Sequence, residues 1–61
     1  MLKLKGKRVE KGLTQEAMAK LLGMEKATYV RKENNKAQFR LDEVRKLLEI
    51  LECRFEDIFL D

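Results

Sequence analysis

Residues 25–36 hold the side chains whose types and spacing best suit binding to another molecule. Arg31 carries a planar guanidinium that can donate two parallel hydrogen bonds, and Lys26 carries a point charge with three donors. On a helix, Ala27 and Val30 would share one face with these two cations. Guanine presents paired acceptors at O6 and N7, and thymine presents a methyl group that suits small apolar side chains. The stretch is therefore typical of a surface that contacts bases in a DNA groove.

The rest of the inventory argues against catalysis. The chain has no histidine and no serine, so the common pairs of base and nucleophile cannot be assembled. The single Cys53 falls among apolar neighbours at helical spacing, and we expect it to be structural. One cysteine can form no disulfide within the chain, and without histidine a zinc site lacks its ligand set. We therefore expect no enzymatic activity, no metal, no cofactor and no small-molecule ligand.

A DNA-binding surface also needs contacts to phosphates, which hold the protein in register without distinguishing base pairs. Gln15 lies at the predicted start of a helix, where free N–H groups and the helix dipole attract a phosphate. Residues 34–36 would contact the backbone on the far side. The predicted phosphate contacts are Gln15, Thr28, Asn34, Asn35 and Lys36, and the predicted base contacts are Glu25, Lys26, Ala27, Val30 and Arg31.

Several charged residues of this stretch keep a second interpretation. Glu25 can accept a hydrogen bond from cytosine N4, or it can satisfy the N–H groups at the start of the helix. Lys32 falls on the inner side, where its stem can lie on the core while its ammonium reaches outward. Lys26 and Arg31 can also be ordinary solvated charges of an exposed helix.

Arg8 and Glu33 are the charged pair best suited to hold the scaffold together. The two predicted helices that carry them should meet near the end of residues 25–34. A guanidinium and a carboxylate can form two parallel hydrogen bonds, which would lock that helix to the first helix of the chain. The alternative is two separate surface charges.

The elements that must position these residues are all predicted to be helical. Apolar residues recur at helical spacing, and no segment alternates cleanly with period two. The pattern predicts helices at residues 2–11, 14–22, 25–34, 41–52 and 55–59. Their inward residues are predicted to be Met1, Leu4, Val9, Met18, Ala19, Leu22, Tyr29, Leu41, Val44, Leu47, Leu48, Leu51, Phe55, Ile58 and Phe59. The predicted fold is an all-α, compact five-helix bundle in one domain, residues 1–61.

The predicted helix ends carry suitable residues. Thr14 precedes the second helix, and its hydroxyl can accept a hydrogen bond from the first turn. Gly12 and Gly23 follow the first two helices, where a left-handed residue commonly ends a helix. Asparagine tolerates positive φ nearly as well, so Asn34 and Asn35 suit the turn after the third helix.

Charge is distributed unevenly along the chain. Residues 1–36 carry ten Lys or Arg against four Glu, a net charge of +6, and residues 37–61 carry four basic against seven acidic residues, a net charge of −3. This asymmetry suits a protein with one surface that meets phosphates. No apolar run approaches the ~20 residues that cross a bilayer, and the N-terminus has no signal-peptide pattern. We expect a cytoplasmic protein with no membrane contact.

Three segments resemble the Cro/C1-type (XRE) helix-turn-helix family, which includes phage lambda-type repressors. Residues 11–23, KGLTQEAMAKLLG, resemble the family's opening motif "KGLTQEELAKLLG". Residues 28–36, TYVRKENNK, followed by Phe39 and Glu43, are similar to the "tYsrKEnGk…F…E" variant of short phage-like regulators from Gram-positive bacteria. Residues 55–59, FEDIF, resemble the closing "leDiF". The motifs keep the family's order and spacing over nearly the whole chain.

The resemblance implies a lambda-repressor-like domain that binds operator DNA, usually as a two-fold dimer. The family's functional positions fall on Gln15, on Lys26, Ala27 and Arg31, on the turn from Asn34 to Lys36, and on the bridge between Arg8 and Glu33. Four positions depart from the family pattern. Asn35 replaces a usual glycine, Val30 stands where a small polar residue is common, and Gly6 and Lys7 replace typical residues of the first helix. The resemblance also implies a nucleoid-associated protein of bacterial or phage origin.

The sequence thus predicts a sequence-specific double-stranded DNA-binding transcriptional regulator, a repressor of phage or mobile-element type. A homodimer would bind a near-palindromic operator, and its candidate dimer surface is the patch of Phe55, Ile58, Phe59 and Leu60. The alternative is an antitoxin-like or adaptor protein-interaction module that keeps the same fold, with the C-terminal half as its functional surface.

Overall fold

Helices account for all the regular structure of residues 3–59, which are the residues that the computed structural model describes. They are α1 (Leu4–Glu10), α2 (Gln15–Leu21), α3 (Lys26–Glu33), α4 (Leu41–Leu51) and α5 (Phe55–Phe59). The all-α prediction is confirmed, and each predicted helix is present with ends that differ by a residue or two. The predicted start of the first helix lies outside the described residues.

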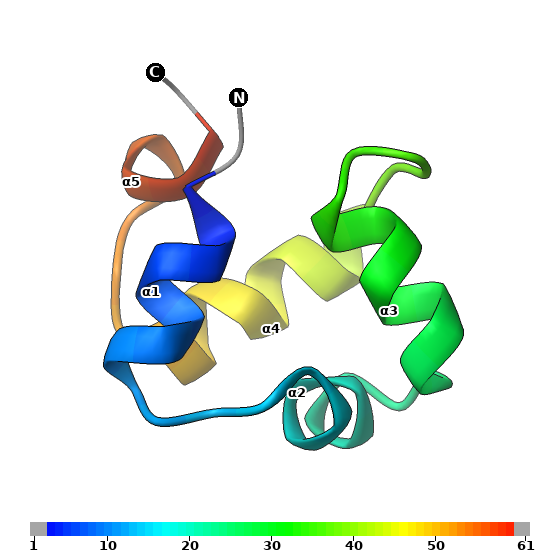
Figure 1. Ribbon diagram of the computed structural model, residues 1–61. Helices are drawn as coiled ribbons and strands as arrows, with labels where there is room; N and C mark the ends of the chain where they lie inside the picture. The colour runs from blue at the N-terminus through cyan, green and yellow to red at the C-terminus, as the bar shows by residue number, and fades with distance from the viewer. Residues whose placement is uncertain (1–2, 60–61) are drawn as a thin grey trace.

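The helices divide into two groups on either side of α4 (Figure 1). α1 and α5 lie side by side at one end, where the backbone N–H of Lys3 donates to the carbonyl of Ile58 over 2.8 Å. α2 and α3 follow each other at the other end, with their axes at a steep angle. α4 runs behind both groups and joins them. None of the described helices is long and apolar enough to cross a membrane.

Side chains next to the helix starts fix where α2, α4 and α5 begin. The Thr14 hydroxyl accepts from the backbone N–H of Ala17 over 3.0 Å, as its capping role predicts. Arg40 and Arg54, which precede α4 and α5, have no side chain that can accept. In these two helices an acidic side chain three residues later fixes the start. Glu43 and Asp57 accept from the backbone N–H of Arg40 and Arg54, over 2.8 and 2.9 Å.

The buried core draws on every helix. It consists of Leu4, Met18, Ala19, Leu22, Tyr29, Leu47, Leu51 and Ile58. Three predicted inward residues are wrong, because Val9 is 59%, Leu41 is 70% and Phe55 is 46% exposed. Met1, also predicted to point inward, lies outside the described residues. α1 is so short that Leu4 and Arg8, one turn apart, occupy its whole inner side. Leu41 is the first residue of α4, and helical side chains lean toward the N-terminus, so it projects past the end of the helix.

Left-handed residues end the helices where the sequence predicts and at one further place. Gly12, Gly23 and Asn35 have φ values of 73°, 71° and 64°. Glu52, at the end of α4, also has a positive φ of 53°, which the sequence did not indicate. Its carboxylate pairs with Lys11 on the surface, so this strained turn is held against the end of α1.

Candidate nucleic-acid interface

A short turn joins α2 to α3 and sets the angle between them. The backbone N–H of Met24 donates to the carbonyl of Ala19 over 2.9 Å, and that of Gly23 donates to Lys20 over 3.1 Å. With its positive φ, Gly23 reverses the chain at the end of α2. Glu25 then adopts an extended conformation with ψ of 151°, and α3 begins at the next residue. The two helices and this turn form a helix-turn-helix.

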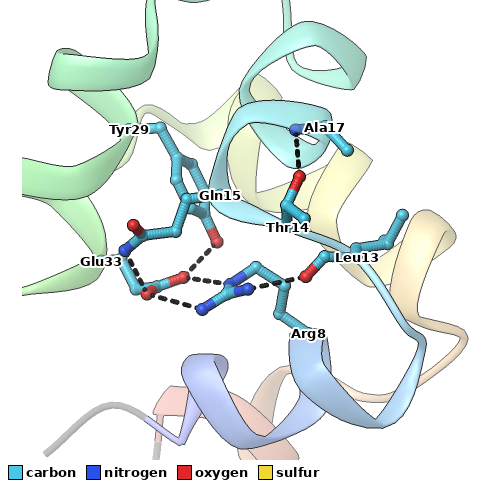
Figure 2. Close-up of polar contacts among 7 residues, drawn as sticks. All are labelled: Arg8, Leu13, Thr14, Gln15, Ala17, Tyr29 and Glu33. Atoms are coloured by element: carbon cyan, nitrogen blue, oxygen red, sulfur yellow. Dashed lines mark hydrogen bonds and ion pairs between the residues drawn. The ribbon is translucent and has the colours of Figure 1, made fainter.

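The inner side of α3 is held by a buried polar cluster that centres on the Glu33 carboxylate (Figure 2). Oε2 accepts from Arg8 Nε over 2.8 Å and from the Tyr29 hydroxyl over 2.6 Å. Oε1 accepts from Gln15 Nε2 over 3.0 Å and from Arg8 Nη2 over 3.3 Å. The predicted pair of Arg8 and Glu33 is thus in direct contact, with side chains only 7% and 2% exposed.

This cluster connects three helices. Arg8 comes from α1, Gln15 from α2, and Tyr29 and Glu33 from α3 (Figure 2). Arg8 also donates through Nη1 to the backbone carbonyl of Leu13 over 2.6 Å, which ties down the connection between α1 and α2. Arg8 Nε and Nη2 therefore hold α3 through Glu33, and Nη1 holds the connection between α1 and α2.

The electrostatics of the cluster keep its carboxylate charged. Burial alone raises the pKa of Glu33, but hydrogen bonds from Arg8, Tyr29 and Gln15 outweigh it, and the pKa falls below its ordinary value. Burial and the hydrogen bond to Glu33 raise the pKa of Tyr29, so its hydroxyl stays a donor. The hydrogen bond to Glu33 also raises the pKa of Arg8. An ionised acceptor is therefore surrounded only by donors.

An ion pair between Lys32 and Glu43 holds the loop after α3. Lys32 Nζ lies 2.7 Å from Glu43 Oε1, with both side chains less than 15% exposed, and 5.9 Å from the centre of the Phe39 ring. Burial raises the pKa of Glu43, but hydrogen bonds from Lys32 and from the Arg40 backbone lower it overall. The Lys32 ammonium is therefore turned to the scaffold.

The outer side of α3 is different. The predicted base contacts Glu25, Lys26, Ala27 and Arg31 are exposed, and Val30 is half-buried. Within residues 3–59, Lys26 and Arg31 take part in no ion pair. Glu25 occupies the N-cap position, but its side chain makes no capping hydrogen bond, so the helix-capping interpretation of this residue is wrong.

Four of the five predicted phosphate contacts lie at the C-terminal end of α3, and Thr28 lies in its first turn. Thr28 and the turn residues Asn34, Asn35 and Lys36 are exposed. The turn is fixed by the backbone N–H of Lys36, which donates to the carbonyl of Arg31 over 2.8 Å. Gln15 is half-buried, and its bond to Glu33 places it beside the last residue of α3. The structure thus brings Gln15 and this turn to the same end of the helix.

Sequence reasoning predicted Arg8 and Glu33 but did not assign Tyr29 or Gln15 to the buried cluster. Tyr29 and Glu33 are four residues apart on one helix, so their contact could have been inferred from spacing alone. The bond between Gln15 and Glu33 had no such signal, because it joins residues of different helices whose crossing angle is set by the turn at Gly23.

An open apolar groove of about 250 Å³ lies between the loop after α3 and α5. It is lined by Lys32, Asn35, Ala37, Gln38, Phe39, Val44, Phe55 and Phe59. Phe55 stacks on Phe59 with ring centres 4.7 Å apart and is 46% exposed. Ile58, predicted as part of a dimer surface, is fully buried and closes the core, so that assignment is wrong. Leu60, from the same patch, lies outside the described residues.

The helix-turn-helix and the exposed basic side of its second helix define a DNA-binding class of protein. A model of the helix-turn-helix family matches residues 4–58, and the chain belongs to this family, in its Cro/C1-type (XRE) form. The resemblance found in the sequence is thereby confirmed, and the protein is a DNA-binding transcription regulator of XRE type. None of the curated proteins compared with the chain matched it.

Proposed function

We propose that the protein is a sequence-specific repressor of phage or mobile-element type that binds a near-palindromic operator as a homodimer. The observation that carries this proposal is the contrast across α3. Its inner side is held by Arg8 and Glu33 in a buried cluster, whereas Lys26 and Arg31 on its outer side are exposed and, within residues 3–59, have no ionic partner. A helix positioned so firmly, with such a surface, suits insertion into a major groove.

In this proposal the outer side of α3 contacts base edges. Arg31 donates two hydrogen bonds to guanine O6 and N7, and Lys26 reaches the same type of acceptor. Ala27 packs on a thymine methyl, with Val30 beside it. Glu25, which makes no capping hydrogen bond, accepts from cytosine N4.

Phosphate contacts on either side would hold α3 in register. Gln15 and the turn at Asn34, Asn35 and Lys36 are grouped around the C-terminal end of the helix, where they can follow one strand. Thr28, in the first turn of α3, would contact a phosphate near the other end. Such contacts add affinity for any duplex and make binding sensitive to salt.

The groove supports the dimeric part of the proposal. Phe55 and Phe59 present a stacked apolar surface. Exposed charges of both signs, Arg40 with Asp42 and Arg54 with Glu56, are close in the sequence to residues that line the groove. A surface with both signs can meet its own copy across a two-fold axis, because each cation then faces an anion. The dimer would set two copies of α3 ~34 Å apart, in successive major grooves. Occupancy of promoter DNA would then repress transcription.

The same groove favours the alternative function, an antitoxin-like or adaptor module whose main partner is another protein. Salt dependence distinguishes the two functions, because binding through phosphates weakens steeply between low and moderate salt. Binding through an apolar groove has no such dependence.

Selection of bound duplexes from a randomised pool, followed at several salt concentrations, tests the proposed function. We expect an enriched inverted repeat whose half-sites are separated by about one helical turn. Salt-sensitive retention without an enriched sequence would contradict sequence specificity. If no duplex is retained even at low salt, the DNA-binding proposal for the intact chain fails and the protein-interaction alternative takes its place.

A further inference from the structure

The Glu33 carboxylate imposes an orientation on the side chain of Gln15. Glu33 Oε1 accepts from Gln15 Nε2 over 3.0 Å, and an ionised carboxylate can only accept. If the Gln15 amide were turned over, its own oxygen would face a buried anion. The NH2 group must therefore point to Glu33.

This orientation leaves one N–H of Gln15 available. The amide nitrogen carries two hydrogens, and only the bond to Glu33 is present for it within residues 3–59. Gln15 is half-buried, so part of its side chain faces solvent, whereas the Glu33 side chain is only 2% exposed. Because Arg8 bonds both carboxylate oxygens, an anion that approaches Gln15 meets no unbalanced negative charge.

We propose that Glu33 is a positioning residue for DNA binding: it holds the Gln15 amide so that the second N–H donates to a phosphate oxygen. This inference rests on the proposed function and adds a second role to a residue that otherwise only joins helices. The same carboxylate then fixes α3 through Arg8 and Tyr29 and fixes the phosphate contact through Gln15. The register of the base contacts and that of the phosphate contact are thus set by one group.

The amide protons of the wild-type chain test the proposal directly. The sequence has only two glutamines, Gln15 and Gln38, so ¹⁵N labelling of the glutamine side chains alone gives two NH2 pairs, without those of Asn34 and Asn35, and a Gln15→Met variant assigns them. Gln38 is exposed and serves as the internal control. In the free protein we expect the Gln15 proton that faces Glu33 to exchange with water at least about tenfold more slowly than the Gln38 protons.

The duplex enriched in the selection is then added. We expect one Gln15 proton to shift and the proton that faces Glu33 to stay in place. A neutral methylphosphonate at one backbone position should abolish this shift. In that duplex Gln15→Met should weaken binding no further, whereas in the unmodified duplex it should weaken binding about tenfold.

A Glu33→Gln variant tests positioning against a purely structural role. A neutral amide at position 33 lets Gln15 turn over, so we expect about tenfold weaker DNA binding and no additional loss when Gln15→Met is combined with it. If the double variant instead weakens DNA binding by the product of the two separate effects, Glu33 does not act through Gln15 and the positioning role is overturned. Should the Glu33→Gln chain not fold, the wild-type spectra decide alone.

Each remaining outcome identifies what has failed. If both Gln15 protons exchange as fast as the Gln38 protons in the free protein, the orientation is overturned, whether or not DNA binds. DNA binding that leaves both Gln15 protons unchanged would overturn the phosphate contact. Absence of any enriched duplex would overturn the proposed function and the phosphate contact, while the exchange rates still decide the orientation.

Discussion

The two sides of α3 differ in how their side chains are held. On the inner side, Tyr29, Lys32 and Glu33 each bond to a group of the scaffold or of the helix itself. On the outer side, Lys26 and Arg31 are exposed, without an ionic partner in the described part of the chain. The helix is therefore positioned by one set of residues and supplies its binding surface with another. Changes on the inner side should alter stability, and changes on the outer side should alter only DNA binding.

The largest expected effect comes from Arg8→Met. It removes the cation from a carboxylate whose side chain is 2% exposed, and loss of one partner of a buried ion pair costs roughly 3–5 kcal/mol. In a domain of this size that is most of the free energy of unfolding. Urea unfolding followed by circular dichroism measures it, with Arg45→Met, at an exposed arginine of α4, as the control. A loss below about 1 kcal/mol would contradict the central role given to the cluster.

Acid should reveal the same cluster in the unaltered chain. Because the pKa of Glu33 in the folded protein lies below its ordinary value of 4.5, its stabilising contribution is complete above that pH. It is lost as pH falls through the lower, folded-state pKa. The pKa of Glu43 is also lowered, so its stabilising contribution is lost with acid in the same direction. We expect the urea midpoint to be steady near neutral pH and to fall below about pH 4.5, and a Glu43→Gln variant to retain most of this fall. A midpoint that does not change with acid would contradict the ionised state of Glu33.

Arg31→Ala tests the outer side of the comparison. Loss of a bidentate contact to guanine should weaken specific binding by about 1–3 kcal/mol and relax selectivity at one base pair, with unfolding unchanged. Arg45→Ala is the matched control, because it removes an exposed arginine from a different helix. If both variants weaken binding equally, Arg31 contributes only charge and its base contact is refuted.

Lys36→Ala should separate phosphate contacts from base contacts. Lys36 lies in the turn after α3, so its loss should weaken binding to all duplexes about equally and reduce the slope of affinity against salt by about 1. Titrations of one specific and one random duplex at several salt concentrations measure this. A change in base preference would move Lys36 to the base-contacting set.

Local signals in the sequence were enough to place the helices and several of their ends. Thr14 predicted the start of α2, and Gly23 and Asn35 predicted left-handed ends, because each depends only on residues close in the chain. The contact between Arg8 and Glu33 was also predicted, from charge complementarity between two helices expected to meet.

Relations between helices were harder to predict. Val9 was assigned to the core on its apolar character, but the short α1 uses Arg8 there, since a charge with a buried partner can replace an apolar side chain. The bond from Gln15 to Glu33 depends on a crossing angle, which no spacing in the sequence records. The same holds for the division of α5, in which Ile58 is fully buried and Phe55 is exposed. The contacts to DNA stay predictions.

Two lysines of α3 offer the finest test, because they belong to one helix and differ only in the side they occupy. Lys32 is paired with Glu43 and largely buried, so Lys32→Met should lower the free energy of unfolding by about 1 kcal/mol and change DNA affinity little. Lys26 is exposed, so Lys26→Met should leave unfolding unchanged and weaken DNA binding by a similar amount. Urea unfolding and DNA titration of both variants give four values. If both substitutions change only the free energy of unfolding, or both change only the DNA affinity, the division of α3 into a positioning side and a binding side is wrong.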